Sequence, residues 1–440
     1  MKGIVFLASI ATSASLMATL PTITANSVTM TQDQSSRLVT ISYTLADAPA
    51  IVTVDIQTNG VSIGADKFQY VAGAVNMKVQ PGTHQITWQP MVEWPSAPQR
   101  LVAYGAKAVV KAWACDDPPP YLVVDLVVSN AYRFYSCVEA IPGGLTNDVT
   151  YKMDKMVMRR IPAKNVTWRM GSPSTEPGSQ WFPRDSEIPH YVRLTKDYYM
   201  GVFEVTQKQL SHFILNGSNF ISNGPTTKGD TLPMTYLTIW DIRGWPTSGS
   251  SNDGKIGQAS TMSENLDEAY ENSPIGILRT LTGLNFNLPT DAQWEYACRA
   301  GTSTGLNNGH EANNWSDVSD IAWGNRSVVT AINIVGMKQP NNWGLYDMHG
   351  NVEEVCLDRY TQGDEFTATF GENYQSGDVV VDPRVGGGVS SDYPRVIRGG
   401  EWYSDTVARF RSAGRKTSRA ASADRSQYRG FRLVCPVEIP

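Results

Sequence analysis

The stretch NNWGLYDMHGNVEEV, residues 341–355, carries the strongest indication of fold in this 440-residue chain. It brings Asp347, His349, Glu353 and Glu354 close together, between glycines that allow tight turns. Oxygen and imidazole groups at this density predict a metal site, a catalytic site, or a loop that needs help to hold its shape. The residues of the stretch leave these three alternatives open.

Further sequence motifs flank this stretch in a definite order. They are TWRMGSP (167–173), EIPHYVRLTKDYYMGVFEVTQKQ (187–209), LPTDAQWEYACRAGT (288–302), RVIRGGEW (395–402), FRSAGR (410–415) and RGFRLV (429–434). Together the blocks resemble the formylglycine-generating enzyme family, also called sulfatase-modifying factor domains, from about residue 166 to 434. The resemblance implies an α+β fold of C-type-lectin-like type with little regular secondary structure.

The resemblance also implies a metal. Family members bind calcium in this turn, and the matching ligands here are the side chains of Asp347 and Glu354 and the carbonyls of Gly350 and Val352. Carboxylate and carbonyl oxygens on an irregular loop suit this ion. The alternative is that these groups only cap a turn through hydrogen bonds. We expect structural calcium.

One departure from the family concerns its chemistry. The resemblance implies a pair of cysteines shortly after the RGG motif, which hold copper(I) and convert a substrate cysteine into formylglycine. The segment RGGEWYSDTVARFRSAGR, residues 398–415, contains no cysteine. Soft thiolates suit copper(I), so we do not expect copper and predict a catalytically silent member, a pseudoenzyme.

Two carboxylates replace other family residues in the same region. Glu353 takes the place of a family tryptophan, and Glu401 that of the serine after RGG, with Ser404 and Asp405 nearby. If the two glutamates converge, like charges raise the pKa of one of them, which predicts an acid/base pair or a seat for a cationic group. The alternative is that both are solvated in a site released from catalysis. Arg398, Arg415 and Arg429 are interpreted as framework residues that pair with carboxylates.

Composition limits the partners and the compartment. The chain has 41% hydrophobic residues, 18% charged residues and a formal charge of −5, with no basic run that would indicate nucleic acid or a membrane surface. Lys2, the apolar residues 3–20 and a cleavage site after Ala25 predict a signal peptide over residues 1–25. No later run is apolar enough to span a membrane. We therefore expect an exported protein, extracellular or periplasmic.

The chain changes pattern along its length. Residues 26–140 alternate apolar and polar positions with a period of two, which predicts an antiparallel β-sandwich of immunoglobulin or fibronectin type. Residues 141–165 are rich in turn formers and are interpreted as a linker, and residues 166–440 as the family domain.

Cys115 and Cys137 lie in the same strand-rich stretch, and the sequence leaves open whether they pair. In residues 288–302, Thr290 and Gln293 predict a helix capping box, and Cys298 a core thiol.

These observations predict a binding protein, whose rigid framework presents loops to a polypeptide or glycan ligand. The second interpretation is an active oxidoreductase of the same family with a different metal site. The ligand and the oligomeric state are not predicted.

Overall fold

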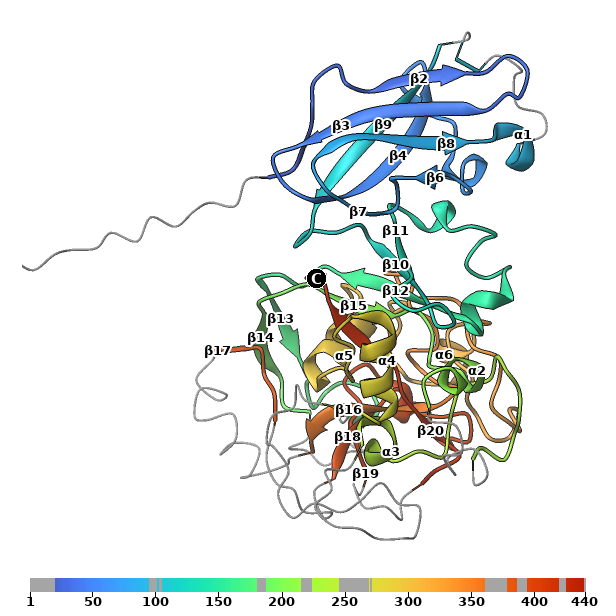
Figure 1. Ribbon diagram of the computed structural model, residues 1–440. Coiled ribbons are helices and arrows are strands. Elements are labelled where there is room, and N and C mark those ends of the chain that lie inside the picture. Colours follow the sequence, from blue (N-terminus) through green and yellow to red (C-terminus); the bar gives the residue numbers. More distant parts are fainter. Residues whose placement is uncertain are drawn as a thin grey trace, which may run out of the picture.

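The structure is a computed structural model that describes residues 20–94, 101–102, 105–179, 187–214, 224–244, 269, 271–360, 378–385, 394–418 and 425–438. Strands gather in an N-terminal unit and in a larger C-terminal unit, which Figure 1 shows one above the other. Helices are short, and the class is α+β, as the sequence predicts. No helix of the described residues has the length and apolarity that a membrane span requires. The predicted signal peptide falls mostly on residues 1–19, outside the described ranges.

The N-terminal unit has two antiparallel sheets that share one core. The first has the order β1-β3-β8-β6 with β2 on β3, and the second has β5-β4-β7 with β9 on β4. Buried and half-buried residues alternate along β3, and Ala50, Val52, Val54 and Ile56 of β4 pack in the same core, so the expected sandwich is present. The strands are β1 (Thr22–Ile23), β2 (Thr29–Gln32), β3 (Val39–Ala46), β4 (Ala50–Thr58), β5 (Val61–Ser62), β6 (Ala72–Gly73), β7 (Met77–Val79), β8 (Gly82–Trp88) and β9 (Ala106–Ala114). Between them lie η1 (Ala65–Lys67) and, after β8, α1 (Pro90–Glu93).

The C-terminal unit begins earlier than the sequence indicates. Its largest sheet has the order β11-β10-β12-β15-β21, from β10 (Tyr121–Asp125), β11 (Tyr132–Tyr135), β12 (Lys155–Ile161), β15 (Tyr198–Gly201) and β21 (Val434–Pro436). The expected sandwich limit at residue 140 and the linker 141–165 do not match this pairing, because β10 and β11 leave the sandwich and the linker contains β12. The alternation of apolar and polar residues in β10 fits a strand of either unit. Only the strand that β10 pairs with shows that it belongs to the C-terminal unit. Helical turns η2 (Val138–Ala140) and η3 (Val149–Lys152) connect β11 to β12.

Two smaller sheets complete the C-terminal unit. One joins β13 (Val166–Met170), β14 (His190–Leu194) and β17 (Val379–Val381). The other has the order β19-β18-β16-β20, from β16 (Glu353–Arg359), β18 (Arg395–Arg398), β19 (Lys416–Ser418) and β20 (Arg429–Gly430). This four-stranded sheet unites motifs that the sequence separates, because β16 begins within the 341–355 stretch and β18 ends at Arg398, the first residue of the RGG motif.

Short helices surround these sheets. They are α2 (Gln207–Ser211), α3 (Ile239–Arg243), α4 (Pro274–Thr282), α5 (Asp291–Arg299), α6 (Trp315–Val318) and η5 (Val407–Phe410). The predicted capping box of α5 is confirmed: the Thr290 hydroxyl accepts from the Gln293 N–H, and the Gln293 side chain accepts from the Thr290 N–H. Cys298 is buried within α5, as predicted.

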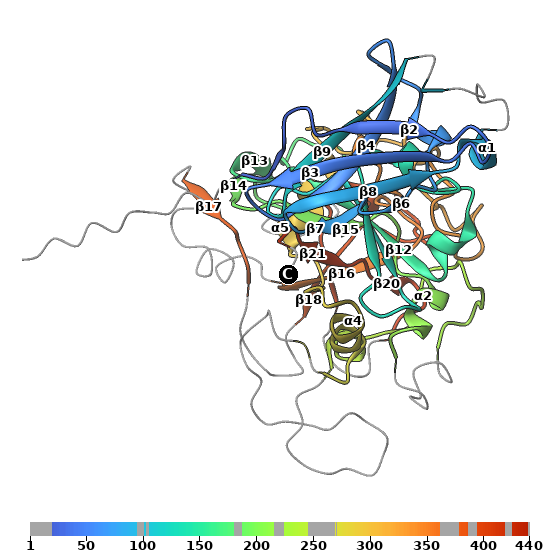
Figure 2. The same cartoon turned by 45° about the horizontal axis from the view of Figure 1, so that its top comes forward.

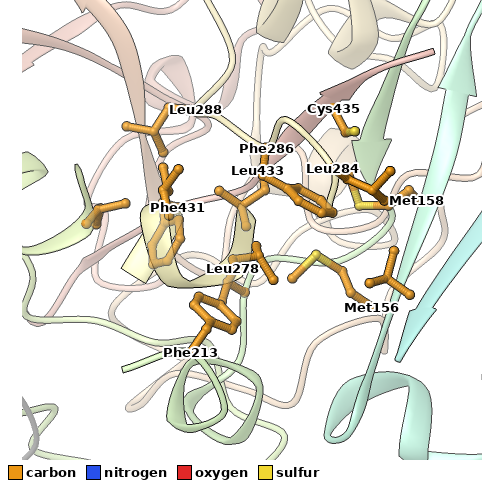
Figure 3. Packing of buried hydrophobic residues seen from close by; sticks show 14 of the residues in the cluster. Met156, Met158, Phe213, Leu278, Leu284, Phe286, Leu288, Phe431, Leu433 and Cys435 are labelled. Carbon is orange, nitrogen blue, oxygen red and sulfur yellow. The ribbon is translucent and has the colours of Figure 1, made fainter. Parts of the chain in front are cut away.

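The main core of the C-terminal unit lies between its largest sheet and the helices (Figure 3). Met156 and Met158 of β12 pack there with Leu278 of α4 and with Phe431 and Leu433 near the C-terminus. The two units also touch: the Phe134 N–H donates to the Asn76 carbonyl at 2.9 Å. In Figure 2 the strands of the N-terminal sandwich cross in front of the C-terminal unit.

Candidate functional site

The turn of residues 347–352 is held by protein groups from a distant block. The Glu204 carboxylate accepts from the Asn351 side-chain amide at 2.7 Å and from the Val352 N–H at 3.1 Å. Asp347 and Asn351 have left-handed backbone, with φ of 59° and 64°. Gly350 is required, because a Cβ there would lie 2.6 Å from the Trp323 carbonyl oxygen. The turn is therefore stabilised in part by a side chain from elsewhere in the chain, in line with the third alternative, a loop that needs help to hold its shape.

Glu204 is a residue that sequence reasoning missed. It stands in the block EIPHYVRLTKDYYMGVFEVTQKQ, and its position near the turn depends on how β15 pairs with β21. Its exposed fraction is 0%. Burial raises its pKa well above the usual range, and Asp347 and Glu354 raise it further. Arg432 partly offsets the three acidic groups.

The predicted calcium ligands fit the ion in part. Asp347 is buried; its Oδ2 accepts from the Gly336 N–H at 2.6 Å, while Oδ1 has no hydrogen-bond partner. Such an orphaned oxygen fits a bound cation. Glu354 fits less well, since Arg432 donates to its oxygens at 2.7 and 3.1 Å and the Trp294 indole donates at 2.8 Å.

Metal binding by side chains alone is not indicated in the described part of the chain. No group of three or more His, Cys, Asp and Glu residues there could hold a metal ion. The predicted calcium site has two carboxylates and two backbone carbonyls, so it differs from a site built from three side chains. Calcium at this turn stays a prediction.

Buried arginines join the blocks, as the sequence interpretation expected. Arg398 is 1% exposed and donates to Asp291 at 2.5 Å and to Glu295 at 3.0 Å. Arg415 pairs with Asp291 at 3.0 Å, and Arg429 with Glu353 at 3.1 Å. Because a buried charge is costly unless it is paired, these contacts fix the relative positions of α5, β16, β18 and β20.

A cleft of about 360 Å³ opens beside the four-stranded sheet. Its lining includes the end of β18 and the RGG turn, together with residues before and within β19. Glu353 and Glu401 both line it, so the two carboxylates that the sequence singled out do converge. The lining residues are Glu353, Tyr360, Ile397, Arg398, Gly399, Gly400, Glu401, Asp405, Thr406, Arg409, Gly414, Arg415, Lys416 and Thr417.

The two glutamates are buried rather than solvated. Glu353 is 1% exposed and accepts from Lys416 Nζ at 2.6 Å and from Arg429 Nε at 3.1 Å. Glu401 is 5% exposed; its Oε1 accepts from Arg409 at 3.3 Å, and its Oε2 has no partner. Burial raises the pKa of Glu401, the negative charge of Glu353 raises it further, and Lys416 and Arg409 lower it.

The two other predicted residues have different positions. Asp405 lies at the mouth of the cleft, with its side chain 51% exposed and 3.7 Å from Arg326. Ser404 is buried, and its hydroxyl donates to the Thr406 carbonyl at 3.0 Å. Ser404 therefore supports the turn and does not line the cleft.

Three thiols of the C-terminal unit lie in hydrophobic cores. Cys298 and Cys356 share one cluster, and Cys435 belongs to the main core (Figure 3). Burial raises the pKa of Cys298 to about 12 and that of Cys435 to about 12, which keeps these thiols neutral. Cys115 and Cys137 are free thiols in this structure.

Aromatic rings form a second feature next to the cleft. Tyr403 and Tyr428 stack at a centroid distance of 5.4 Å, and Trp402 packs against both rings. Trp402 is buried, whereas Tyr403 is 45% exposed. Of the two aromatics that follow RGG, only Tyr403 is available to a ligand.

The motifs and the geometry agree with a family comparison. Residues 152–437 match the model of the sulfatase-modifying factor enzyme 1-like domain. The chain belongs to this family. The match begins before the predicted limit at residue 166 and includes β12, in agreement with the sheet pairing.

Individual relatives are distant. The formylglycine-generating enzyme of Bos taurus is 24% identical over 357 residues, 75% of this chain and 87% of that protein. That of Thermomonospora curvata is 28% identical over 291 residues, 61% and 90% of the two chains. A chaperone protein named LppX from Paenibacillus barcinonensis is 32% identical over 182 residues. This last match spans 36% of this chain and 61% of that relative, less than two thirds of its length.

Two solved structures align with part of this chain. PvdO from Pseudomonas aeruginosa aligns with a TM-score of 0.45 and 18% identity, covering 64% of this chain and 94% of that one. Treponema denticola variable protein 1 aligns with a TM-score of 0.44 and 22% identity, covering 64% and 95%.

Proposed function

We propose that the C-terminal unit binds a polypeptide or glycan ligand in the cleft between the RGG turn and β19, and does not oxidise cysteine. The observation that carries this proposal is Glu401: a nearly buried carboxylate that lines the cleft with one oxygen unpartnered. A buried polar atom without a partner costs free energy, so a ligand that supplies a donor recovers it.

The framework around the cleft supports binding. Arg398 and Arg415, which form part of its wall, are fixed by Asp291 and Glu295 of α5. Rigid walls reduce the entropy lost when a ligand is held. The lining residues offer oxygen and nitrogen donors, whereas copper(I) requires thiolates. An acid/base role for Glu353 and Glu401 belongs to the alternative, an active oxidoreductase with a different metal site.

Export and calcium belong to the same proposal. A signal peptide at the N-terminus would deliver the chain to an extracellular or periplasmic compartment, where calcium is available to the turn. Cleavage after Ala25 would remove β1, which pairs with Leu45 and Ala46 of β3. We expect the ion to be structural, with Asp347 supplying its free oxygen.

One experiment separates the two functions. The purified full chain is incubated with a sulfatase-derived cysteine peptide in oxygen, with and without copper, and aldehyde formation is measured by mass spectrometry. In parallel the chain is applied to peptide and glycan arrays, beside the variant Glu401→Gln. We expect no aldehyde and a set of array ligands that the variant loses. Aldehyde formation in either incubation overturns the proposal, and so does the absence of any array ligand.

A further inference from the structure

The chain itself places cations at the carboxylates of the cleft. The Lys416 ammonium lies 2.6 Å from Glu353 Oε2, and the Arg409 guanidinium lies 3.3 Å from Glu401 Oε1. These two internal contacts show which chemistry the cleft accommodates. The second is long and comes from a side chain that is 39% exposed, so it is a weak contact in solvent.

The Glu401 carboxylate can accept more hydrogen bonds than the neighbouring residues donate. Its Oε2 is buried, faces no donor, and belongs to a side chain that is 5% exposed. A carboxylate accepts several hydrogen bonds, and here Arg409 supplies a single contact. The unpartnered atom is therefore a carboxylate oxygen, which can accept a hydrogen bond.

The neighbourhood favours a charged donor over a neutral one. Glu353 and Glu401 repel each other inside the same cleft, where water screens them poorly, and Lys416 and Arg409 oppose this repulsion from side chains that are about 40% exposed. A hydroxyl group would satisfy Oε2 but would leave this repulsion in place. A cation satisfies the oxygen and offsets the repulsion together. Asp405 at the mouth adds a third acidic group on the path inward.

We propose that this cleft recognises an ammonium or guanidinium group, which donates to Oε2 of Glu401 between the walls formed by the RGG turn and β19. The inference rests on the proposed function and specifies its ligand class: the basic end of a polypeptide side chain or of a free amine. A volume of about 360 Å³ is small for a binding pocket and suits one such side chain. Arg409 and Lys416, with side chains 39% and 41% exposed, lie where they can move aside.

Calorimetric titration of the full chain tests the inference. The probes are n-butylammonium, n-butylguanidinium and Nα-acetyl-lysine methylamide, and the neutral control is Nα-acetyl-norleucine methylamide. We expect cationic probes to bind and the norleucine control not to bind. The variant Glu401→Gln keeps the shape of the side chain and removes its charge, so affinity falls by about tenfold or more. Comparison of the free amine with the lysine derivative distinguishes the two sources of the cation.

Two further variants complete the design. Lys416→Met removes the competing internal cation, and we expect probe affinity to rise several-fold. Glu438→Gln changes an exposed carboxylate that pairs with Lys196, and we expect no effect. Equal binding of the norleucine control, or unchanged affinity in both cleft variants, overturns the inference. If cationic probes fail while array ligands still bind through Glu401, the ligand class is wrong and binding stands; if no ligand of any class binds, the proposed function fails as well.

Discussion

Glu354 and Glu401 are two buried glutamates near the same sheet that differ in what surrounds them. Glu354, 1% exposed, accepts from the Arg432 guanidinium through both oxygens and from the Trp294 indole. Glu401, 5% exposed, accepts one long contact from Arg409. Burial alone does not mark a functional residue. A buried charge with all its partners belongs to the framework, whereas one with an unused oxygen at a cleft indicates a site for a ligand.

Removing the arginine that pairs with Glu354 should change the free energy of unfolding most. Arg432→Met leaves Glu354 without its counter-ion and removes donors from the Gly201, Val202 and Tyr346 carbonyls. We expect a loss of about 3–5 kcal/mol in the free energy of unfolding, measured by urea titration. The control Lys196→Met breaks an exposed pair and should cost less than about 1 kcal/mol. Similar midpoints for the two variants would contradict the assignment of Arg432 to the framework.

His349 is another buried group whose partners all lie within the protein, and it makes stability depend on pH. Its Nδ1 contacts the Phe410 carbonyl at 2.5 Å and its Nε2 faces the Asn307 N–H at 3.1 Å, so the buried ring is neutral. Burial lowers its pKa from 6.5 to about 4. The unfolded state therefore binds a proton that the folded state does not. This contribution to stability is fully present above pH 6.5 and is lost as the pH falls through about 4.

We expect this histidine to remove about 3 kcal/mol of stability across that range. Urea unfolding at pH 7.0, 5.5 and 4.5 measures it as the difference between the wild type and His349→Gln, which cancels the opposite contributions of carboxylates such as Asp358. Burial raises the pKa of Asp358 to about 6, so its contribution falls as the pH rises. A slope unchanged in His349→Gln refutes the prediction.

Calcium removal tests how the turn of residues 347–352 is stabilised. If Asp347 Oδ1 holds the ion, EGTA lowers the Tm of the wild type by a few degrees, which corresponds to about 1–2 kcal/mol. Asp347→Asn should abolish this sensitivity, and Asp405→Asn should preserve it. A wild-type Tm that does not respond to EGTA indicates that Glu204 and Arg432 hold the turn without an ion.

The smallest expected effect concerns the stability of the cleft. Glu401→Gln removes a buried charge that repels Glu353 and has one weak partner, so the free energy of unfolding should change by less than about 1 kcal/mol. Thermal unfolding followed by circular dichroism measures it against Arg432→Met. A loss as large as that of Arg432→Met would place Glu401 in the framework and remove the reason for assigning it a ligand.

Much of the fold and part of the site followed from sequence. The strands β3, β4, β8 and β9 lie where the alternation predicts, and the capping box of α5 lies at Thr290 and Gln293. The sequence singled out Glu353 and Glu401 but left open whether they converge or are solvated; the cleft that both line comes from the fold. Glu204 did not follow from sequence, because its contact with Val352 joins residues separated by 148 positions. Nor did the limit of the C-terminal unit, since alternation does not say which sheet receives a strand.

The sequence by itself determined the family, the absence of cysteine after RGG and the two carboxylates that replace family residues, because these properties depend only on residue identity and order. The tertiary structure decided which carboxylates are satisfied. Arg432 reaches Glu354, while Glu401 keeps a free oxygen in the cleft. The reason is physical: desolvation and pairing are set by the distances between groups that the fold brings together, and a linear pattern does not contain those distances.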